Sequence, residues 1–248
     1  MRLWICGVRG STPAPGEGFL RYGGQTSCVA VLHDDEDTPR LVLDGGTGLR
    51  RLTTMMDGAP FRGSILIGHL HWDHTHGLPF FRAGDHPDAN VKVVIPEQGD
   101  AAEVMARVCS PPHFPVRLEE LKGNWNVGSI DEGTHEIEGF QVTAVEIPHK
   151  NSRTFGFRVS DGKASIAYLS DHAPQNEGPG PDGFGPYHDA ARTLADGVDM
   201  LIHDAQYTAE EFPHRKDYGH SAIEYAVGLG KACGVKEVML YHLSLIHI

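Results

Sequence analysis

The sequence has few cysteines, and none of them stand close together. Four occur in 248 residues, at Cys6, Cys28, Cys109 and Cys233, and no two form a Cys-x-x-Cys pair. This spacing excludes a zinc ribbon and gives no sign of a disulfide framework. We therefore expect reduced, mostly buried thiols, as in a cytosolic protein.

Basic residues are also scarce. Lys and Arg number 21 against 33 Asp and Glu, which gives a formal net charge of −12. Nucleic-acid binders gain much of their affinity by neutralising phosphates, and anionic membranes attract basic segments. We therefore expect neither a stable nucleic-acid partner nor a membrane partner, and the acidic chain leaves a homodimer open.

Long apolar runs are absent as well. No run approaches the roughly 20 residues that a membrane-spanning helix needs. The first ten residues, MRLWICGVRG, also lack the charged, apolar and small regions of a signal peptide. The expected location is the cytoplasm.

The remaining composition is that of an ordinary globular protein, with 40% hydrophobic and 22% charged residues. We expect a single domain over residues 1–242. The last six residues, Leu243-Ser-Leu-Ile-His-Ile248, resemble the translation of an adapter used in sequencing libraries. We interpret 243–248 as a non-native tail, the alternative being a natural apolar terminus, and leave His247 out of the site.

Short apolar runs between turn residues predict many strands and few helices. The predicted strands are Leu3–Val8, Ser27–His33, Leu41–Asp44, Ser64–Gly68, Val91–Ile95, Gln141–Ile147, Thr154–Ser160, Ala164–Ser170, Met200–His203 and Glu237–Tyr241. The predicted helices are Gly48–Met56, Asp100–Cys109, Tyr187–Ala195 and Ser221–Cys233. In the last of these, Ser221 is expected to cap the start and Gly234 the end. The pattern predicts an α/β (α+β) fold with two sheets flanked by helices.

One stretch, Pro174–Pro186, is too rich in glycine and proline for regular structure. It would serve either as a linker that splits the chain or as a mobile loop beside a site. Apolar strands are predicted on both sides of it, which favours the loop.

The strongest signal for chemistry is His69-Leu-His71-Trp-Asp73-His74, which follows an apolar strand that ends at Gly68. Four imidazole or carboxylate donors within six residues are hard to explain as ordinary core or surface residues. Such donors suit Zn²⁺ and, less often, Mn²⁺ or Fe²⁺. We expect Trp72 to pack beneath this loop, the alternative being that it lines a cleft.

Four donors do not complete two metal sites, so others are expected at the ends of other strands. Three predicted strands end on such a donor, at His149, Asp171 and His242. Each is weak evidence alone. Together with the cluster at 69–74 they predict two sites of three or four ligands that share Asp171.

This pattern, His-x-His-x-Asp-His followed by a distal His, Asp and His, resembles the metallo-β-lactamase-fold hydrolases over nearly the whole chain. The resemblance implies a four-layer αββα sandwich with two divalent metal ions, Zn²⁺ first among them. It also implies seven ligands: His69, His71 and His149 for the first ion, Asp73, His74 and His242 for the second, and Asp171 as the bridge.

Within that family the chain is most similar to the phosphodiesterase branch, which includes ribonuclease Z and the phosphoribosyl cyclic phosphodiesterases. The opening loops around Gly7 and Gly23 resemble those of the branch, and Asp44 begins a similar Asp-x-Gly-x-Gly turn, where it supports a metal ligand. Ile202-His-Asp204-Ala-Gln and Gly219-His220-Ser-Ala resemble the branch's His-Glu-Ala-Thr and Gly-His-Ser-Thr motifs.

The resemblance implies three catalytic residues: His220, Asp204 and Asp73. A metal-bridging hydroxide would attack phosphorus, and His220, oriented by Asp204, would protonate the leaving oxygen. Asp204 is one methylene shorter than the usual Glu. The resemblance therefore implies a metal-dependent hydrolase, most simply a phosphodiesterase.

The interval between His149 and Asp171 is 22 residues, too short for the tRNA-gripping insertion of ribonuclease Z. This favours a small-molecule substrate, a cyclic or nucleotide-like phosphodiester, over tRNA. Two alternatives stay open. One is a carboxylic ester, thioester or lactone hydrolase at the same dinuclear centre, and the other is a non-catalytic metal- or ligand-binding module.

The other histidines are assigned no function. His172 and His203 neighbour site residues and should point away from them in extended backbone. Six more are expected at the surface: His76, His86, His113, His135, His188 and His214.

Overall fold

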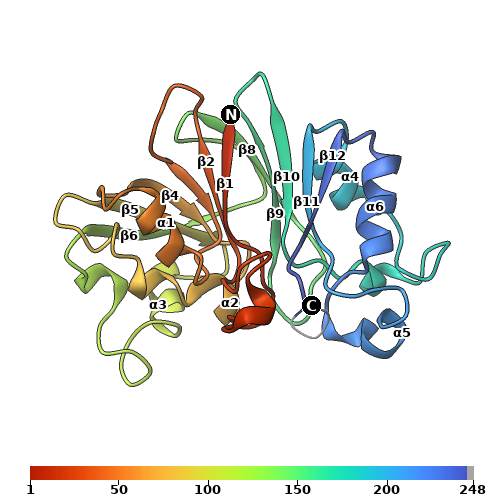
Figure 1. Ribbon diagram of the computed structural model, residues 1–248, viewed down its shortest axis with the longest axis horizontal. Coiled ribbons are helices and arrows are strands. Elements are labelled where there is room, and N and C mark those ends of the chain that lie inside the picture. Colours follow the sequence, from red (N-terminus) through yellow and green to blue (C-terminus); the bar gives the residue numbers. More distant parts are fainter. Residues whose placement is uncertain (245–248) are drawn as a thin grey trace. The chain divides into compact units, whose positions relative to one another are not determined.

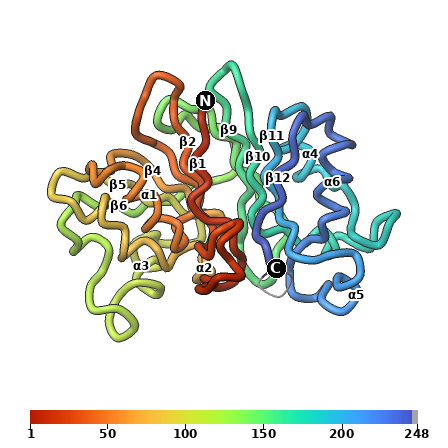
Figure 2. The backbone as a smooth tube through the Cα atoms, in the orientation of Figure 1, coloured from red at the N-terminus to blue at the C-terminus, as the bar shows by residue number. Residues whose placement is uncertain are grey.

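The computed structural model describes residues 1–244, so most of the suspected tail, with His247, lies outside the described residues. The chain divides into two compact units, Met1–Asp131 and Glu132–Ile248, whose backbones are traced in Figure 2. The division falls well before Pro174–Pro186, so this stretch is not the linker between the units. A single domain over 1–242 stays a prediction.

The first unit contains a mixed six-stranded sheet. In spatial order its strands are β1 (Arg2–Gly7), β2 (Cys28–Leu32), β3 (Leu41–Leu43), β4 (Arg62–Leu66), β5 (Asn90–Pro96) and β6 (Asn124–Ile130). The first three strands pair antiparallel, and β3 to β6 run parallel. Parallel strands place their carboxyl ends at one edge, which is where loops of such sheets carry functional residues.

Three α-helices belong to this unit: α1 (Leu49–Met55), α2 (Trp72–Thr75) and α3 (Ala101–Ala106). Single 3₁₀ turns lie at Glu17–Phe19, Leu78–Phe80 and Leu118–Glu120. Leu52 of α1 and Met105 of α3 join Ile65 and Val93 of the sheet in one buried cluster. Burial of each such side chain contributes roughly 1.5–3 kcal/mol, so this core holds the strand ends in place.

The second unit contains another mixed sheet of six strands. In spatial order these are β12 (Glu237–Tyr241), β11 (Met200–Asp204), β10 (Ser165–Leu169), β9 (Phe155–Ser160), β8 (Phe140–Glu146) and β7 (Gly133–Ile137). Strands β7 to β10 pair antiparallel, whereas β10, β11 and β12 run parallel.

Helices α4 (Asp189–Ala195) and α6 (Ile223–Ala232) pack on one face of this second sheet and touch each other (Figure 1). Leu194 and Leu229 carry that contact in a buried cluster with Leu169 and Leu201. Helix α5 (Phe212–Arg215) and 3₁₀ turns at Pro174–Glu177 and Lys216–Tyr218 complete the unit.

The ten predicted strands and four predicted helices are all present, with small shifts at their ends. Two strands were not predicted. Strand β6 carries Asn124, Asn126 and Gly128, which weaken its strand pattern, and β7 is an edge strand with no fully buried residue. The predicted cap at Ser221 is wrong, because the residue before α6 is Ala222 and no side chain caps the helix. The cap at Gly234 is confirmed by its φ of 64°.

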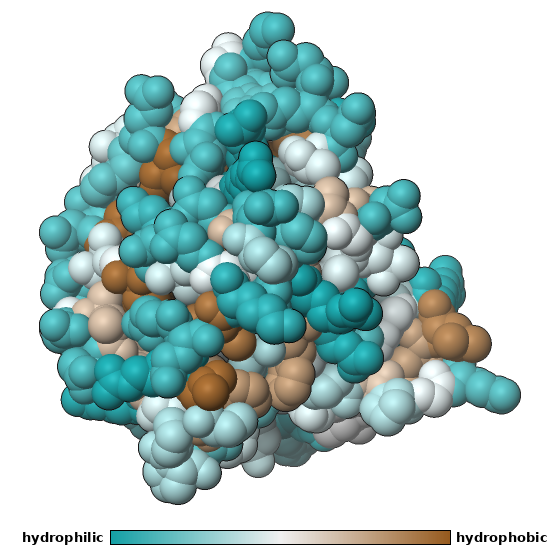
Figure 3. Space-filling model, turned by 90° about the vertical axis from the view of Figure 1, so that its left-hand side faces the viewer, coloured by the Kyte–Doolittle hydropathy of each residue, from teal (hydrophilic) through white to brown (hydrophobic). Residues whose placement is uncertain are grey.

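The face of the molecule in Figure 3 is largely hydrophilic, with apolar residues scattered over it. Trp72 is 69% exposed and stacks on His76, so its predicted packing beneath the metal loop is wrong. Between residues 1 and 244, no helix has the length and apolar character that crossing a membrane requires.

Candidate metal centre

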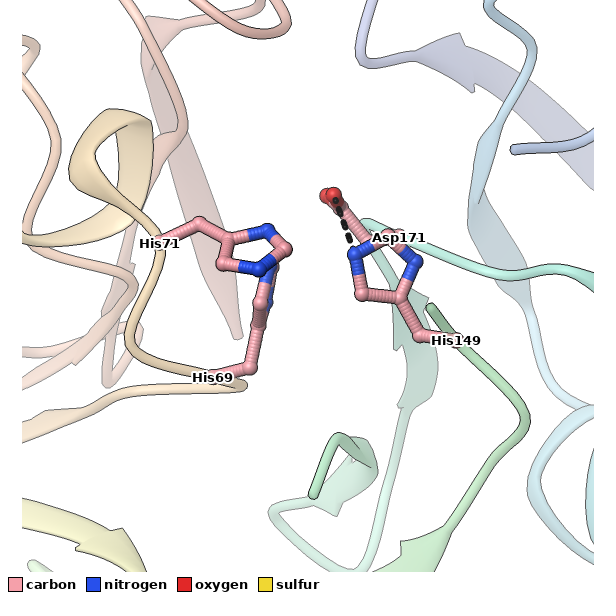
Figure 4. A group of neighbouring side chains, drawn as sticks. All are labelled: His69, His71, His149 and Asp171. Carbon is pink, nitrogen blue, oxygen red and sulfur yellow. Dashed lines mark ion pairs between the residues drawn. The ribbon is translucent and has the colours of Figure 1, made fainter. Parts of the chain in front are cut away.

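In the first unit, the predicted donors follow strand β4 and run into helix α2. The ring of His69 lies 4.3 Å from that of His71 and 4.3 Å from that of His74, measured between centroids. Figure 4 shows the rings of His69 and His71 against each other. His74 Nε2 is 3.4 Å from Asp73 Oδ2. The structure thus brings all four donors of this segment together, with His71 exposed and the other three buried.

Asp44, at the end of β3, holds His74 from behind. Its Oδ2 lies 2.7 Å from His74 Nδ1, and its Oδ1 accepts a hydrogen bond of 2.8 Å from the Gly68 amide. Since a carboxylate accepts, His74 carries its proton on Nδ1 and presents Nε2 as a donor atom. A buried carboxylate behind a ligating histidine is a recurrent arrangement at metal sites.

Asp73 is held by a backbone group that sequence patterns do not reveal. The Ser11 amide donates to Asp73 Oδ2 at 2.7 Å. Ser11 has a φ of 65°, an uncommon conformation that turns this amide toward the carboxylate. The only signal for it in the sequence is its place in the opening glycine loop.

In the second unit, the predicted donors lie just after three separate strands. His149 follows β8, Asp171 follows β10 and His242 follows β12. His149 Nε2 is 3.6 Å from one Asp171 oxygen, the ion pair drawn in Figure 4, and His242 Nε2 is 3.1 Å from the other. All three side chains are buried. The structure thus brings the three distal donors together around the carboxylate of Asp171.

His149 is oriented by the backbone of Gly219. Its Nδ1 donates to the Gly219 carbonyl at 2.7 Å, so Nε2 is left as the donor atom. Gly219 has a φ of 94°, and a Cβ there would lie 2.8 Å from Cβ of Lys150. Glycine is therefore required for this carbonyl to reach His149.

The predicted catalytic pair is also in contact. His220 Nδ1 lies 3.0 Å from Asp204 Oδ2, so the shorter aspartate does reach its histidine. The amides of Gln206 and His172 donate to the two oxygens of the Asp204 carboxylate, at 3.1 Å each. These two amides hold the carboxylate in place.

His220 also lies close to the metal donors of its unit. Its Nδ1 is 3.8 Å from Asp171 Oδ2, and its ring stacks on that of His242 with 4.7 Å between centroids. Asp204, His220 and His242 offer donor atoms within 4.8 Å of one another. This geometry is compatible with a proton donor beside a metal ion and with a further ligand.

Behind Asp204, His172, His203 and His188 form a row of hydrogen-bonded rings. His172 and His203 are fully buried, and burial lowers the pKa of both imidazoles. Burial likewise lowers the pKa of His188. The prediction that His188 belongs to the surface is wrong, because its ring is half-buried against His172.

The chemistry of the donors fits divalent metal ions. Imidazole and carboxylate are the ligands of zinc and of related transition metals in proteins. His74 and His149 each have one nitrogen engaged by an acceptor, so the other is ready for a cation. Both groups of donors thus suit a metal site, whereas nothing in this chemistry selects zinc.

Comparison with known proteins identifies the family of the chain. A model of the β-lactamase superfamily domain matches residues 40–243. Ribonuclease Z of Bacillus cereus is 26% identical over an alignment that covers 92% of this chain and 86% of that protein.

Solved structures agree in fold. Human tRNase Z, short form, has a TM-score of 0.72 at 21% identity, covering 98% of this chain and 93% of that one. A diphosphatase of the PhnP family has a TM-score of 0.71 at 19% identity, covering 98% and 86%. The predicted fold class is confirmed. The chain belongs to the β-lactamase superfamily of hydrolases and has the metallo-β-lactamase fold.

Proposed function

We propose that the protein is a dinuclear metal-dependent phosphodiesterase that acts on small cyclic or nucleotide-like phosphodiesters. The observation that carries this proposal is the Asp204–His220 pair, joined at 3.0 Å beside the Asp171 carboxylate. A metal-binding module has no need of such a pair. The likeness to ribonuclease Z, an enzyme named for RNA cleavage, supports phosphodiester chemistry.

In this proposal the two groups of donors together hold two divalent ions. His69, His71 and His149 would hold one ion, Asp73, His74 and His242 the other, and Asp171 both. When bound, such ions lower the pKa of water from about 15.7 to near 7 and stabilise charge on phosphoryl oxygens. Membership of the superfamily and the oriented nitrogens of His74 and His149 support this assignment.

His220 would protonate the departing alkoxide. To donate from Nε2 while Nδ1 stays bonded to a carboxylate, a histidine must carry a proton on each nitrogen. Asp204 is that carboxylate, and the amides of His172 and Gln206 hold it in the accepting orientation. General acid catalysis of this kind contributes typically 10²–10⁴-fold in rate.

The substrate would be small. Strands β9 and β10 fill half of the 22-residue interval between His149 and Asp171, which leaves no long arm there to grip a macromolecule. The net charge of −12 also disfavours a polyanionic partner. RNA is the second candidate, because the similarity to ribonuclease Z covers most of both proteins.

The test is an activity screen of the protein loaded with one metal at a time, Zn²⁺, Mn²⁺ or Fe²⁺. Its substrates are bis(p-nitrophenyl) phosphate, cyclic nucleotides, a tRNA precursor, a thioester and a lactone. We expect hydrolysis of the small diesters, and loss of it in His220→Ala with metal content unchanged. Preference for the thioester or lactone over every diester would reject the proposal, and preference for the tRNA precursor would replace its substrate.

A further inference from the structure

Three imidazole rings of the second unit form a continuous row that ends at a backbone carbonyl. His188 Nε2 lies 2.8 Å from His172 Nε2, and His172 Nδ1 lies 2.9 Å from His203 Nε2. His203 Nδ1 lies 2.7 Å from the carbonyl oxygen of Asp204. The three residues come from the loop after β10, the end of β11 and the residue before α4, so the row joins three elements.

The direction of every hydrogen bond in the row follows from its last acceptor. A carbonyl oxygen can only accept, so His203 carries its proton on Nδ1 and accepts on Nε2. His172 must then donate from Nδ1 and accept on Nε2, and His188 must donate from Nε2. With one proton on each ring, these contacts leave no other order.

The row therefore does not deliver protons to the site. A proton entering at His188 would pass from ring to ring and stop at the carbonyl, which has no proton to release in turn. What the row does is fix the ring of His172, which Tyr225 also flanks at 5.5 Å between centroids. The effect of this row on the site follows from the contacts of the His172 backbone.

The backbone of His172 lies between two carboxylates, those of Asp171 and Asp204, that are both close to His220. The His172 amide donates to Asp204 Oδ2, the same atom that accepts from His220 Nδ1. The preceding residue, Asp171, has its Oδ2 only 3.8 Å from that nitrogen. A small rotation would let His220 bond Asp171 in place of Asp204, and would take from Asp171 an oxygen proposed for metal binding.

We infer that His172 is a positioning residue, held by His203 and His188, which keeps His220 bonded to Asp204 and so reserves Asp171 for metal. The inference rests on the proposed function, because it concerns the proton donor of that reaction. It assigns a role to residues that the chain's motifs leave unexplained.

Two variants and one control test the inference in the metal-loaded protein. His172→Phe keeps a flat ring but removes both ring hydrogen bonds. His172→Asn restores a donor near the position of Nδ1, toward His203. His135→Phe makes the same change in β7, outside the row, and serves as the control.

The kinetic measurement compares bis(p-nitrophenyl) phosphate with diphenyl phosphate, whose poorer leaving group gains more from protonation. We expect His172→Phe to lower kcat for diphenyl phosphate at least about tenfold more than for the nitrophenyl ester, with KM little changed. In His172→Asn the losses of kcat for the two esters should differ less than in His172→Phe. In His135→Phe they should not differ. Equal losses on both esters would overturn the inference, because a merely structural defect slows both alike.

A second measurement does not depend on activity. Nitrogen–proton NMR spectra of ¹⁵N-histidine-labelled protein distinguish the two neutral tautomers of each ring. We expect His172, assigned by its loss in His172→Phe, to carry a proton on Nδ1 alone, and any other state overturns the inference. If the parent protein cleaves no diester of the activity screen, the proposed function fails, and these spectra still decide whether the row exists.

Discussion

The two units carry the proposed metal donors in different ways. In the first unit, four donors lie within six consecutive residues, at the end of one strand and in the short helix after it. In the second, three donors come from the ends of β8, β10 and β12, which are far apart along the chain. The donors of the first unit thus form one short motif, whereas those of the second unit come from three separate strands.

The difference predicts which of the two groups of donors is more sensitive to substitution of a supporting residue. The segment 69–74 is held by its own turn of helix, by Asp44 and by the Ser11 amide. The dispersed donors share no such turn, because each lies after its own strand, and His149, for example, is oriented by the Gly219 carbonyl. Loss of one supporting residue should therefore disturb the second unit more than the first.

The largest effect is expected from removing the carboxylate shared by both ions. Asp171→Ala should lose both ions and lower activity by at least about 1,000-fold, because the nucleophilic water depends on them. Asp73→Ala, in the other unit, should lose only about one ion. Elemental analysis of metal per chain measures both, and full occupancy in Asp171→Ala would contradict the bridging role.

The next effect concerns the proton donor. His220→Ala should lower kcat by about 10²–10⁴-fold while metal content stays that of the parent protein, because general acid catalysis is lost and the ligands remain. Steady-state kinetics with parallel metal analysis measures this. If metal is lost as well, His220 is a ligand, as its closeness to Asp204 and His242 also permits.

A matched pair of supporting substitutions compares the units directly. Gly219→Ala places a side chain at a φ of 94° and against Lys150, so it should displace the carbonyl that orients His149. Asp44→Asn adds no heavy atom but leaves one acceptor oxygen for two donors, His74 Nδ1 and the Gly68 amide. Each should weaken metal affinity by roughly 10–100-fold.

We expect the larger loss in Gly219→Ala, because a side chain strains its backbone and meets Lys150, whereas Asp44→Asn adds no heavy atom. Titration of the metal-free protein with Zn²⁺ gives both affinities. A larger loss in Asp44→Asn would reverse the comparison between the units.

The smallest effect is on stability against pH. Burial lowers the pKa of His172 and His203 in the folded protein, so the unfolded chain binds more protons than the folded one in acid. Their contribution to stability is complete above about pH 6.5, the ordinary histidine value, and is lost as the pH falls below it. The loss is at most about 1.4 kcal/mol per pH unit for each ring.

Urea unfolding at a series of pH values measures this loss. His172→Phe should show a shallower dependence than the parent protein, whereas His135→Phe should not. A free energy of unfolding that rises as the pH falls from 7 toward 5 would contradict the assignment, since the sign follows from the lowered pKa values.

The side-chain donors could be predicted from the sequence because they follow apolar strands. The cluster at 69–74 and the strand ends at His149, Asp171 and His242 could be predicted in this way, and the structure brings each group together within its unit. The strands themselves followed from buried runs such as Cys28–Leu32.

The backbone groups that orient the site residues could not be predicted from the sequence. The Ser11 amide, the Gly219 carbonyl and the His172 amide orient site residues through atoms that every residue has, so no residue type marks them. His188 was misplaced for a related reason. It lies just after a stretch rich in glycine and proline, and only the fold supplies the ring of His172 as its partner.

The most direct test of the account is a crystal structure of zinc-loaded protein with anomalous diffraction data at the zinc edge. The account predicts two anomalous peaks, each contacted by donors from both units, with the Asp171 carboxylate touching both. One peak, or peaks held by the donors of one unit alone, would contradict it.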